Sequence, residues 1–220
     1  MIIDLLRYLV PLITILTASI GFGFYEKLGK SIWRTFPIYL LLLGVLDGIG
    51  YLIKDTFINN FLYIYILIPC QILYFSYLYY TLSNLEISKR IIKICSIFLV
   101  VSFIVFGYYF KYDFNNLDFY FTNNSILLFI IIVILYFYEV IYLDKILYTL
   151  KDMQFWVSLG LILYYLFTFP YYSFYRILFE NNSSIIKIMF NIEKPLCLLM
   201  YTFFIIGFIL KEKNESKYTI

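Results

Sequence analysis

The chain has 220 residues, of which 63% are hydrophobic, 23% aromatic and 14% charged, and its formal net charge is +3. This composition excludes a soluble globule, because too few polar side chains are present to cover its surface. Histidine is absent, so zinc hydrolases, Ser–His proteases, histidine-ligated haem proteins and histidine proton relays lose an essential group, and we expect no enzyme, cofactor or metal site.

Seven apolar segments stand between clusters of charge, and each is about 19–23 residues long, which is enough to cross a hydrocarbon core of roughly 30 Å. In chain order they cover residues 3–24, 35–53, 61–82, 91–110, 125–143, 155–175 and 188–210. The sequence therefore predicts an all-α polytopic membrane protein with one seven-helix transmembrane domain, 1–210. A charged cytoplasmic tail is predicted over 211–220, and the longest predicted loop is 111–124.

The first two predicted helices carry small residues that allow close contact between helices. In the second, Gly44 and Gly48 form a small-xxx-small pair, which is typical of a close helix crossing. The first has a patch of small residues near its expected cytoplasmic end: Thr17, Ala18, Ser19, Gly21 and Gly23.

Asp47 is the only aspartate deep in a predicted span, and two enzyme interpretations of it fail. The run Asp47-Gly48-Ile49-Gly50 lacks the D-G-x-x-A-R pattern and the later aspartates of CDP-alcohol phosphotransferases. An intramembrane aspartyl protease needs a G-x-G-D turn and a second aspartate that shares a proton. We therefore expect Asp47 to act as a single carboxylate and not as half of a catalytic dyad.

The third and fifth predicted helices add one notable polar group each. Gln71 lies near mid-membrane, whereas Glu139 lies about one turn from the end of its span. We expect Glu139 to reach the inner interface, towards Lys93 or Lys145. The three cysteines also fall within spans and imply no disulfide or metal framework: Cys70, Cys95 and Cys197.

Aromatic residues mark both ends of the sixth predicted helix. Phe155 and Trp156 stand at its start, and Tyr171, Tyr172 and Tyr175 stand near its end. Pairs of aromatic belts are typical of the two membrane–water interfaces. We expect these side chains to anchor the span and not to form a site.

The seventh predicted helix departs most from an ordinary membrane helix, because Glu193, Lys194 and Pro195 interrupt its apolar run. An ionisable group inside a span costs roughly 2.5–3.5 kcal/mol on insertion scales, and such groups mark functional sites. At about 1.5 Å per residue, Asp47, Gln71 and Lys194 fall in one layer of the outer leaflet.

This layer predicts an intramembrane polar site made of five residues: Asp47, Gln71, Asn191, Glu193 and Lys194. Lys194 has two interpretations. It either pairs with Asp47 and holds the second and seventh helices together, or it extends towards the outer headgroups while 195–210 makes the true span. Pro195 is compatible with both, because it could kink the helix or begin the span.

The distribution of Lys and Arg predicts the orientation of the helices. Because cytoplasmic loops carry an excess of positive charge, we expect the N-terminus outside and the C-terminus in the cytoplasm, as a multi-pass protein of the bacterial inner membrane. Most of the cations fall in loops of one side, including six that define a cationic face: Lys27, Lys30, Arg34, Lys89, Arg90 and Lys93. This face could contact a cytoplasmic partner or anionic lipid, although cations that only set topology are the simpler interpretation.

A weak internal repeat relates the first three predicted helices to the last three. Leu43-Gly44 is echoed by Leu159-Gly160, and Pro69 by Pro195. A 3+1+3 plan with an outside N-terminus is similar to that of the SWEET sugar transporters and the PnuC vitamin transporters. The similarity is architectural, because the fifth helix has no proline where a SWEET triplet carries one.

Three segments resemble small seven-helix integral membrane proteins of Bacteroidota: GVLDGIG over 44–50, LYFSYLYY over 73–80 and FWVSLGLILY over 155–164. The resemblance covers most of the chain and supplies no catalytic residues. It implies a non-enzymatic membrane component that acts with soluble partners, such as a signalling or phage-defence accessory.

Three functions are compatible with these features. The first is a non-catalytic sensor, effector or regulatory subunit that works with a cytoplasmic partner. The second is a small-solute or ion transporter, or a pore, that uses the layer of Asp47, Gln71 and Lys194. The third is a retinal-type photoreceptor with Lys194 in its seventh helix, but the aspartate four residues earlier and the Arg-Trp-x-x-Asp pattern are missing. A homo-oligomer is compatible with all three, and no feature predicts direct binding of nucleic acid.

Overall fold

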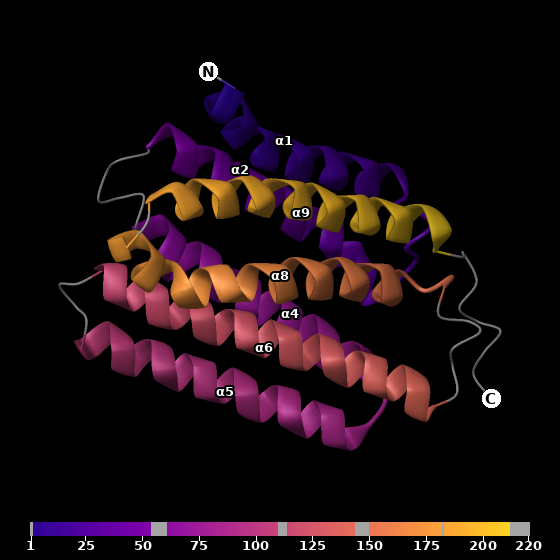
Figure 1. Ribbon diagram of the computed structural model, residues 1–220. Helices are drawn as coiled ribbons and strands as arrows, with labels where there is room; N and C mark the ends of the chain where they lie inside the picture. Colours follow the sequence, from indigo (N-terminus) through magenta and orange to yellow (C-terminus); the bar gives the residue numbers. More distant parts are fainter. Residues whose placement is uncertain (1, 54–60, 110–113, 144–149, 182, 212–220) are drawn as a thin grey trace.

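The computed structural model describes residues 2–53, 61–109, 114–143, 150–181 and 183–211, with side chains except those of 2–8, 51, 114–115, 118, 175–181 and 183–191. Seven long helices in these residues lie side by side in one bundle (Figure 1). They are α1 (Ile2–Gly23), α2 (Thr35–Leu52), α4 (Ile68–Leu82), α5 (Glu86–Tyr109), α6 (Phe114–Tyr142), α8 (Met153–Asn181) and α9 (Ser183–Leu210). A 3₁₀ turn, η1 (Ile32–Arg34), precedes α2, and a π-helical segment, η2 (Tyr63–Leu67), runs into α4.

Six helices are long and apolar enough to cross a membrane, as expected for a multi-pass membrane protein. Their apolar parts are Ile32–Gly50, Tyr63–Leu82, Glu86–Tyr109, Phe119–Tyr142, Met153–Phe174 and Ile192–Leu210, and α1 adds a shorter apolar helix, Leu9–Gly23. The prediction of an all-α fold is confirmed for the described residues, which contain no strand. Orientation, the identity of the membrane and the 3+1+3 repeat stay predictions.

The predicted loop 111–124 is wrong in most of its length, because α6 already begins at Phe114. Asparagines suggested a loop there, yet their polar groups find partners within and between helices. Asn123 donates through Nδ2 to the carbonyl oxygen of Phe119 at 2.8 Å and accepts through Oδ1 from Ser173 of α8 at 2.9 Å. A helix with such partners can be polar on one side without unwinding.

Two glycines allow close helix crossings. A Cβ atom on Gly44 would lie 2.7 Å from Cγ1 of Ile15 in α1, and one on Gly160 would lie 3.0 Å from the carbonyl oxygen of Met200 in α9. The predicted crossing at Gly44 is therefore confirmed. Gly48 was predicted to share that crossing, which is wrong, because a Cβ there would meet nothing within 4 Å.

Aromatic rings fill the core at the opposite end of α2 from Asp47. Phe36 is fully buried, and its ring centroid lies 5.3 Å from that of Phe204 and 5.7 Å from that of Phe208 in α9. The ring of Tyr39, one turn further along α2, stacks on Tyr74 of α4 at 3.9 Å. These contacts tie α2, α4 and α9 together below the polar residues described next.

Reporter fusions test the predicted orientation. Fusions after Lys30, Arg90 and Lys151 are expected to report the cytoplasm, because these positions belong to the clusters of Lys and Arg that mark the predicted cytoplasmic side. Fusions at Asn116 and Asn181 are expected to report the outside. A phosphatase and fluorescent-protein pair makes the measurement, and a cytoplasmic-loop fusion that reports the outside would overturn the orientation.

Candidate functional site

A cavity of about 520 Å³ lies inside the bundle. Its walls come from α1, α2, η2, α4, α6, α8 and α9, whereas α5 takes no part among the residues described. The cavity is on the side where α2 ends and η2 begins. Gln71 in its wall lies eight residues beyond the start of η2, which corresponds to about 12 Å along the helix.

Four of the five residues predicted for the polar site line this one cavity: Asp47, Gln71, Glu193 and Lys194. The side chain of the fifth, Asn191, lies outside the described side chains. Counting residues from the predicted helix ends thus selected residues of three helices, far apart in sequence, that line the same cavity. Whether they act as a site stays a prediction.

Asp47 of α2 is held by a tyrosine. The hydroxyl of Tyr63 donates a hydrogen bond to Oδ1 of Asp47 at 2.5 Å. Gly50, nearly one turn after Asp47, leaves room for that ring, because a Cβ atom there would lie 2.7 Å from Cε2 of Tyr63. The short run Asp47 to Gly50 therefore supplies both the acceptor and the space for its donor.

Tyr63 comes from an irregular stretch of backbone. It begins the π segment η2, in which the N–H of Ile68 bonds to the carbonyl oxygen of Tyr63, five residues back. Pro69 follows at the start of α4 and has no N–H to continue a regular ladder. Single π turns of this kind are frequent at functional sites. Here the segment turns Tyr63, Ile64 and Leu67 towards the cavity.

Glu193 of α9 is held by two tyrosines of α8. Its Oε1 accepts hydrogen bonds from the hydroxyls of Tyr172 at 2.8 Å and Tyr164 at 3.2 Å. The two tyrosines are eight residues apart, about two helical turns, so they share one face of α8. Tyr172 was predicted to anchor its span and not to form a site, yet its hydroxyl binds Glu193 and its side chain lines the cavity.

Gln71 completes this set of tyrosine contacts. Its Nε2 donates to the hydroxyl of Tyr165 at 3.1 Å, which joins α4 to α8. The Tyr165 ring stacks on Phe129 of α6, with centroids 4.7 Å apart and planes 6° from parallel. The amide is therefore fixed in the wall by a ring that is itself held by packing.

Lys194 follows Glu193 in α9 and is buried in the cavity wall, with 7% of its surface exposed. This burial departs from the interpretation in which Lys194 extends to the headgroups. The hydrogen bond described for the carboxylate of Asp47 comes from Tyr63. In the part of the chain that the structure describes, no ion pair joins Asp47 to Lys194.

Glu139 lies away from this cavity and does not reach the inner interface as predicted. It is 5% exposed and accepts a hydrogen bond from the Ser83 hydroxyl and another, at 2.9 Å, from the backbone N–H of Asn84. It thus secures the junction between α4 and α5. Lys93, one expected partner, is exposed, and the other, Lys145, lies outside the described residues.

Two lysines near the C-terminal end of α9 donate hydrogen bonds to protein groups there. Lys27 donates to the carbonyl oxygen of Ile209 at 2.9 Å, and cations are favourable at a helix C-terminus. Lys211, the first residue of the predicted charged cytoplasmic tail, is 4% exposed and donates to Ser31 Oγ at 3.4 Å. The rest of the predicted tail, 212–220, lies outside the described residues.

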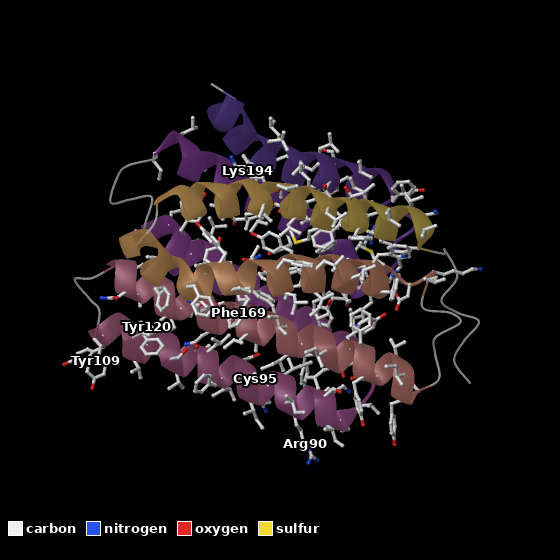
Figure 2. The ribbon with its side chains drawn as sticks, viewed as in Figure 1. Arg90, Cys95, Tyr109, Tyr120, Phe169 and Lys194 are labelled. Carbon is white, nitrogen blue, oxygen red and sulfur yellow. The ribbon has the colours of Figure 1, made fainter. Side chains whose placement is uncertain are left out.

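The other residues of the cationic face divide into two groups. The Arg34 guanidinium lies 4.3 Å from the centroid of the Tyr25 ring, and Lys89 pairs with Glu86 at 3.1 Å. The remaining three are Lys30, Arg90 and Lys93, which are exposed. Figure 2 shows Arg90 pointing away from the bundle. Contact of this face with a partner or with lipid stays a prediction.

The tyrosine contacts were not predicted. The chain has 25 tyrosines, so their presence in any one span carries little information. The usable signal for Glu193 was the i, i+8 spacing of Tyr164 and Tyr172, opposite an acidic residue on the neighbouring helix. Within the described residues, no group of three or more His, Cys, Asp or Glu side chains could hold a metal ion.

Comparison of the chain with family models, with curated proteins and with solved structures finds no match. Function is therefore inferred from the chemistry of the cavity.

Proposed function

We propose that the protein is a non-enzymatic membrane carrier that binds a small polar solute in this cavity, in the bacterial inner membrane and with its N-terminus outside. The main observation behind it is a space of about 520 Å³ lined by Asp47, Gln71, Glu193 and Lys194 within an apolar bundle. Ionisable residues inside a membrane are costly and mark substrate pathways. The volume is in the range of small-molecule sites, about 300–1,000 Å³.

The backbone of two lining helices supports a carrier. Tyr63 and Leu67 lie in the π segment that precedes Pro69, and Lys194 is followed directly by Pro195 inside α9. Proline removes a helical hydrogen bond, and kinks occur at such points. Transporters place interrupted helices around their substrate sites, because irregular backbone is tolerated where it lines a cavity.

The sensor or regulatory subunit that works with a cytoplasmic partner remains an alternative. A ligand-binding sensor would use the same cavity, so binding alone does not separate the two functions. Uptake by proteoliposomes separates them. A carrier moves the bound solute across the bilayer, whereas a sensor binds it without net transfer.

A solute screen tests the proposal. Purified protein is heated with amines, amino acids, carboxylates, sugars and nucleosides, and its melting temperature is measured. We expect at least one class to stabilise it, by about 2.7 kcal/mol at 100 times its Kd. Ser125→Phe should abolish this effect, because Ser125 is 3% exposed and lines the cavity on α6.

Leu127→Phe is the matched control. Leu127 is on the same helix, but it is 43% exposed on the outer surface of the bundle. The control should keep the full stabilisation by the solute. The proposal fails if no class stabilises the protein, or if the stabilisation persists in Ser125→Phe that retains its helical circular dichroism.

A further inference from the structure

Two carboxylates on different helices line the cavity, and each accepts hydrogen bonds from tyrosine through only one of its two oxygens. Oδ1 of Asp47 accepts from Tyr63, and Oε1 of Glu193 accepts from Tyr164 and Tyr172. Across the described residues, the second oxygen of each carboxylate accepts no hydrogen bond from the protein. An ionised carboxylate has about four acceptor positions, so both groups keep capacity for a donor on a ligand.

The charge of the wall favours a positive ligand. Among the described lining residues, two carboxylates face one ammonium, that of Lys194. If all three are ionised, the wall carries an excess negative charge in a region of low dielectric, where an uncompensated charge is costly. A cationic ligand reduces this cost, whereas an anionic ligand increases it.

The aromatic lining points the same way. The hydroxyls of Tyr164 and Tyr172 fix their rings beside Glu193, and the stacked pair Phe129 and Tyr165 forms another part of the wall. Ammonium groups are attracted to aromatic faces within about 6 Å. Carboxylates surrounded by aromatic rings therefore match an organic cation better than a sugar or a carboxylic acid.

We infer that the solute is a small organic amine, whose ammonium group binds the carboxylates of Asp47 and Glu193 and whose apolar part packs on the tyrosine and phenylalanine rings. This inference rests on the proposed function and narrows it to one chemical class. Two of its N–H groups donate to the second oxygens of Asp47 and Glu193, which the described protein groups leave open. Lys194 adds a positive charge to the same wall and so limits how many positive charges the ligand carries.

Three probes of almost equal shape test the class: phenethylamine, 3-phenylpropionate and 2-phenylethanol. Their binding to the purified protein is measured by calorimetry and by thermal shift. We expect phenethylamine to bind at least about tenfold more tightly than either other probe, a difference of the size that one charge-assisted hydrogen bond supplies. Ser125→Phe should abolish its binding.

Charge-neutral variants of the same shape locate the ammonium. Glu193→Gln and Asp47→Asn should each weaken phenethylamine binding about tenfold or more. Lys194→Met should strengthen it and should weaken any binding of 3-phenylpropionate. Glu86→Gln is the control, because Glu86 is exposed on α5 and pairs with Lys89 outside the cavity; it should leave binding unchanged.

The outcomes separate this inference from the proposed function. If 3-phenylpropionate or 2-phenylethanol binds and Ser125→Phe abolishes that binding, while phenethylamine does not bind, the amine class is wrong and the solute cavity stands. If sodium or potassium chloride raises the melting temperature of the protein more than choline chloride does, and no amine binds, the ligand is an inorganic cation and the amine class is wrong. If no probe and no class in the wider screen binds, both proposals fail.

Discussion

Glu139→Ala is expected to lower the free energy of unfolding by about 2–6 kcal/mol, because two donors lose their acceptor and each unsatisfied donor costs about 1–3 kcal/mol. The carboxylate is buried and accepts from the Ser83 hydroxyl and the Asn84 N–H, at the turn where α4 ends and α5 is about to begin. Alanine leaves both donors without this acceptor and removes the link between α6 and that turn.

Unfolding in mixed micelles with increasing dodecyl sulfate, followed by circular dichroism, measures this loss. Glu139→Gln should cost less, about 1 kcal/mol, because its carboxamide still accepts from Asn84 and bonds to Ser83. Glu86→Ala is the matched surface control and should cost at most about 0.5 kcal/mol, since Glu86 forms an exposed pair with Lys89. An Ala variant of Glu139 as stable as the control would contradict the buried junction.

The apolar runs predicted the helices because their length and hydropathy are local properties of the chain. Depth counting also placed Asp47, Gln71 and Lys194 together, since the rise per residue of a helix is nearly constant. The predictions failed at polar residues whose hydrogen-bond partners are distant in sequence. Asn123 suggested a loop, but it lies in a helix and accepts a hydrogen bond from Ser173 of α8. Glu139 suggested a charge at the membrane interface, but it accepts a hydrogen bond from the backbone N–H of Asn84.

The tyrosines around the carboxylates were not predicted, for a different reason. Which ring faces which carboxylate depends on the rotation of each helix about its axis, and that is set by close contacts such as Gly160 against Met200. A composition with 25 tyrosines gives no preference among them. The sequence therefore predicted the acidic and basic wall residues but not the hydroxyls that hold them.

The central claim is that the cavity admits a solute from water, and Cys197 reports on it directly. Cys197 lines the cavity one turn after Glu193 and is 6% exposed, whereas Cys70 is exposed on the surface of the bundle. In a variant with Cys70→Ser and Cys95→Ser, Cys197 is the remaining thiol. Thiol reactivity depends on access, so modification measures entry of the reagent into the cavity.

The measurement is the rate at which a membrane-impermeant trimethylammonium methanethiosulfonate modifies Cys197 in intact cells. The account predicts modification from outside, slowed at least about tenfold by Ser125→Phe, which blocks access, and unchanged by Leu127→Phe. Phenethylamine should protect the thiol in proportion to its occupancy. A Cys197 that stays unmodified while a cysteine placed at Asn116 reacts, or that reacts equally fast in Ser125→Phe and Leu127→Phe, would contradict a solute-accessible cavity.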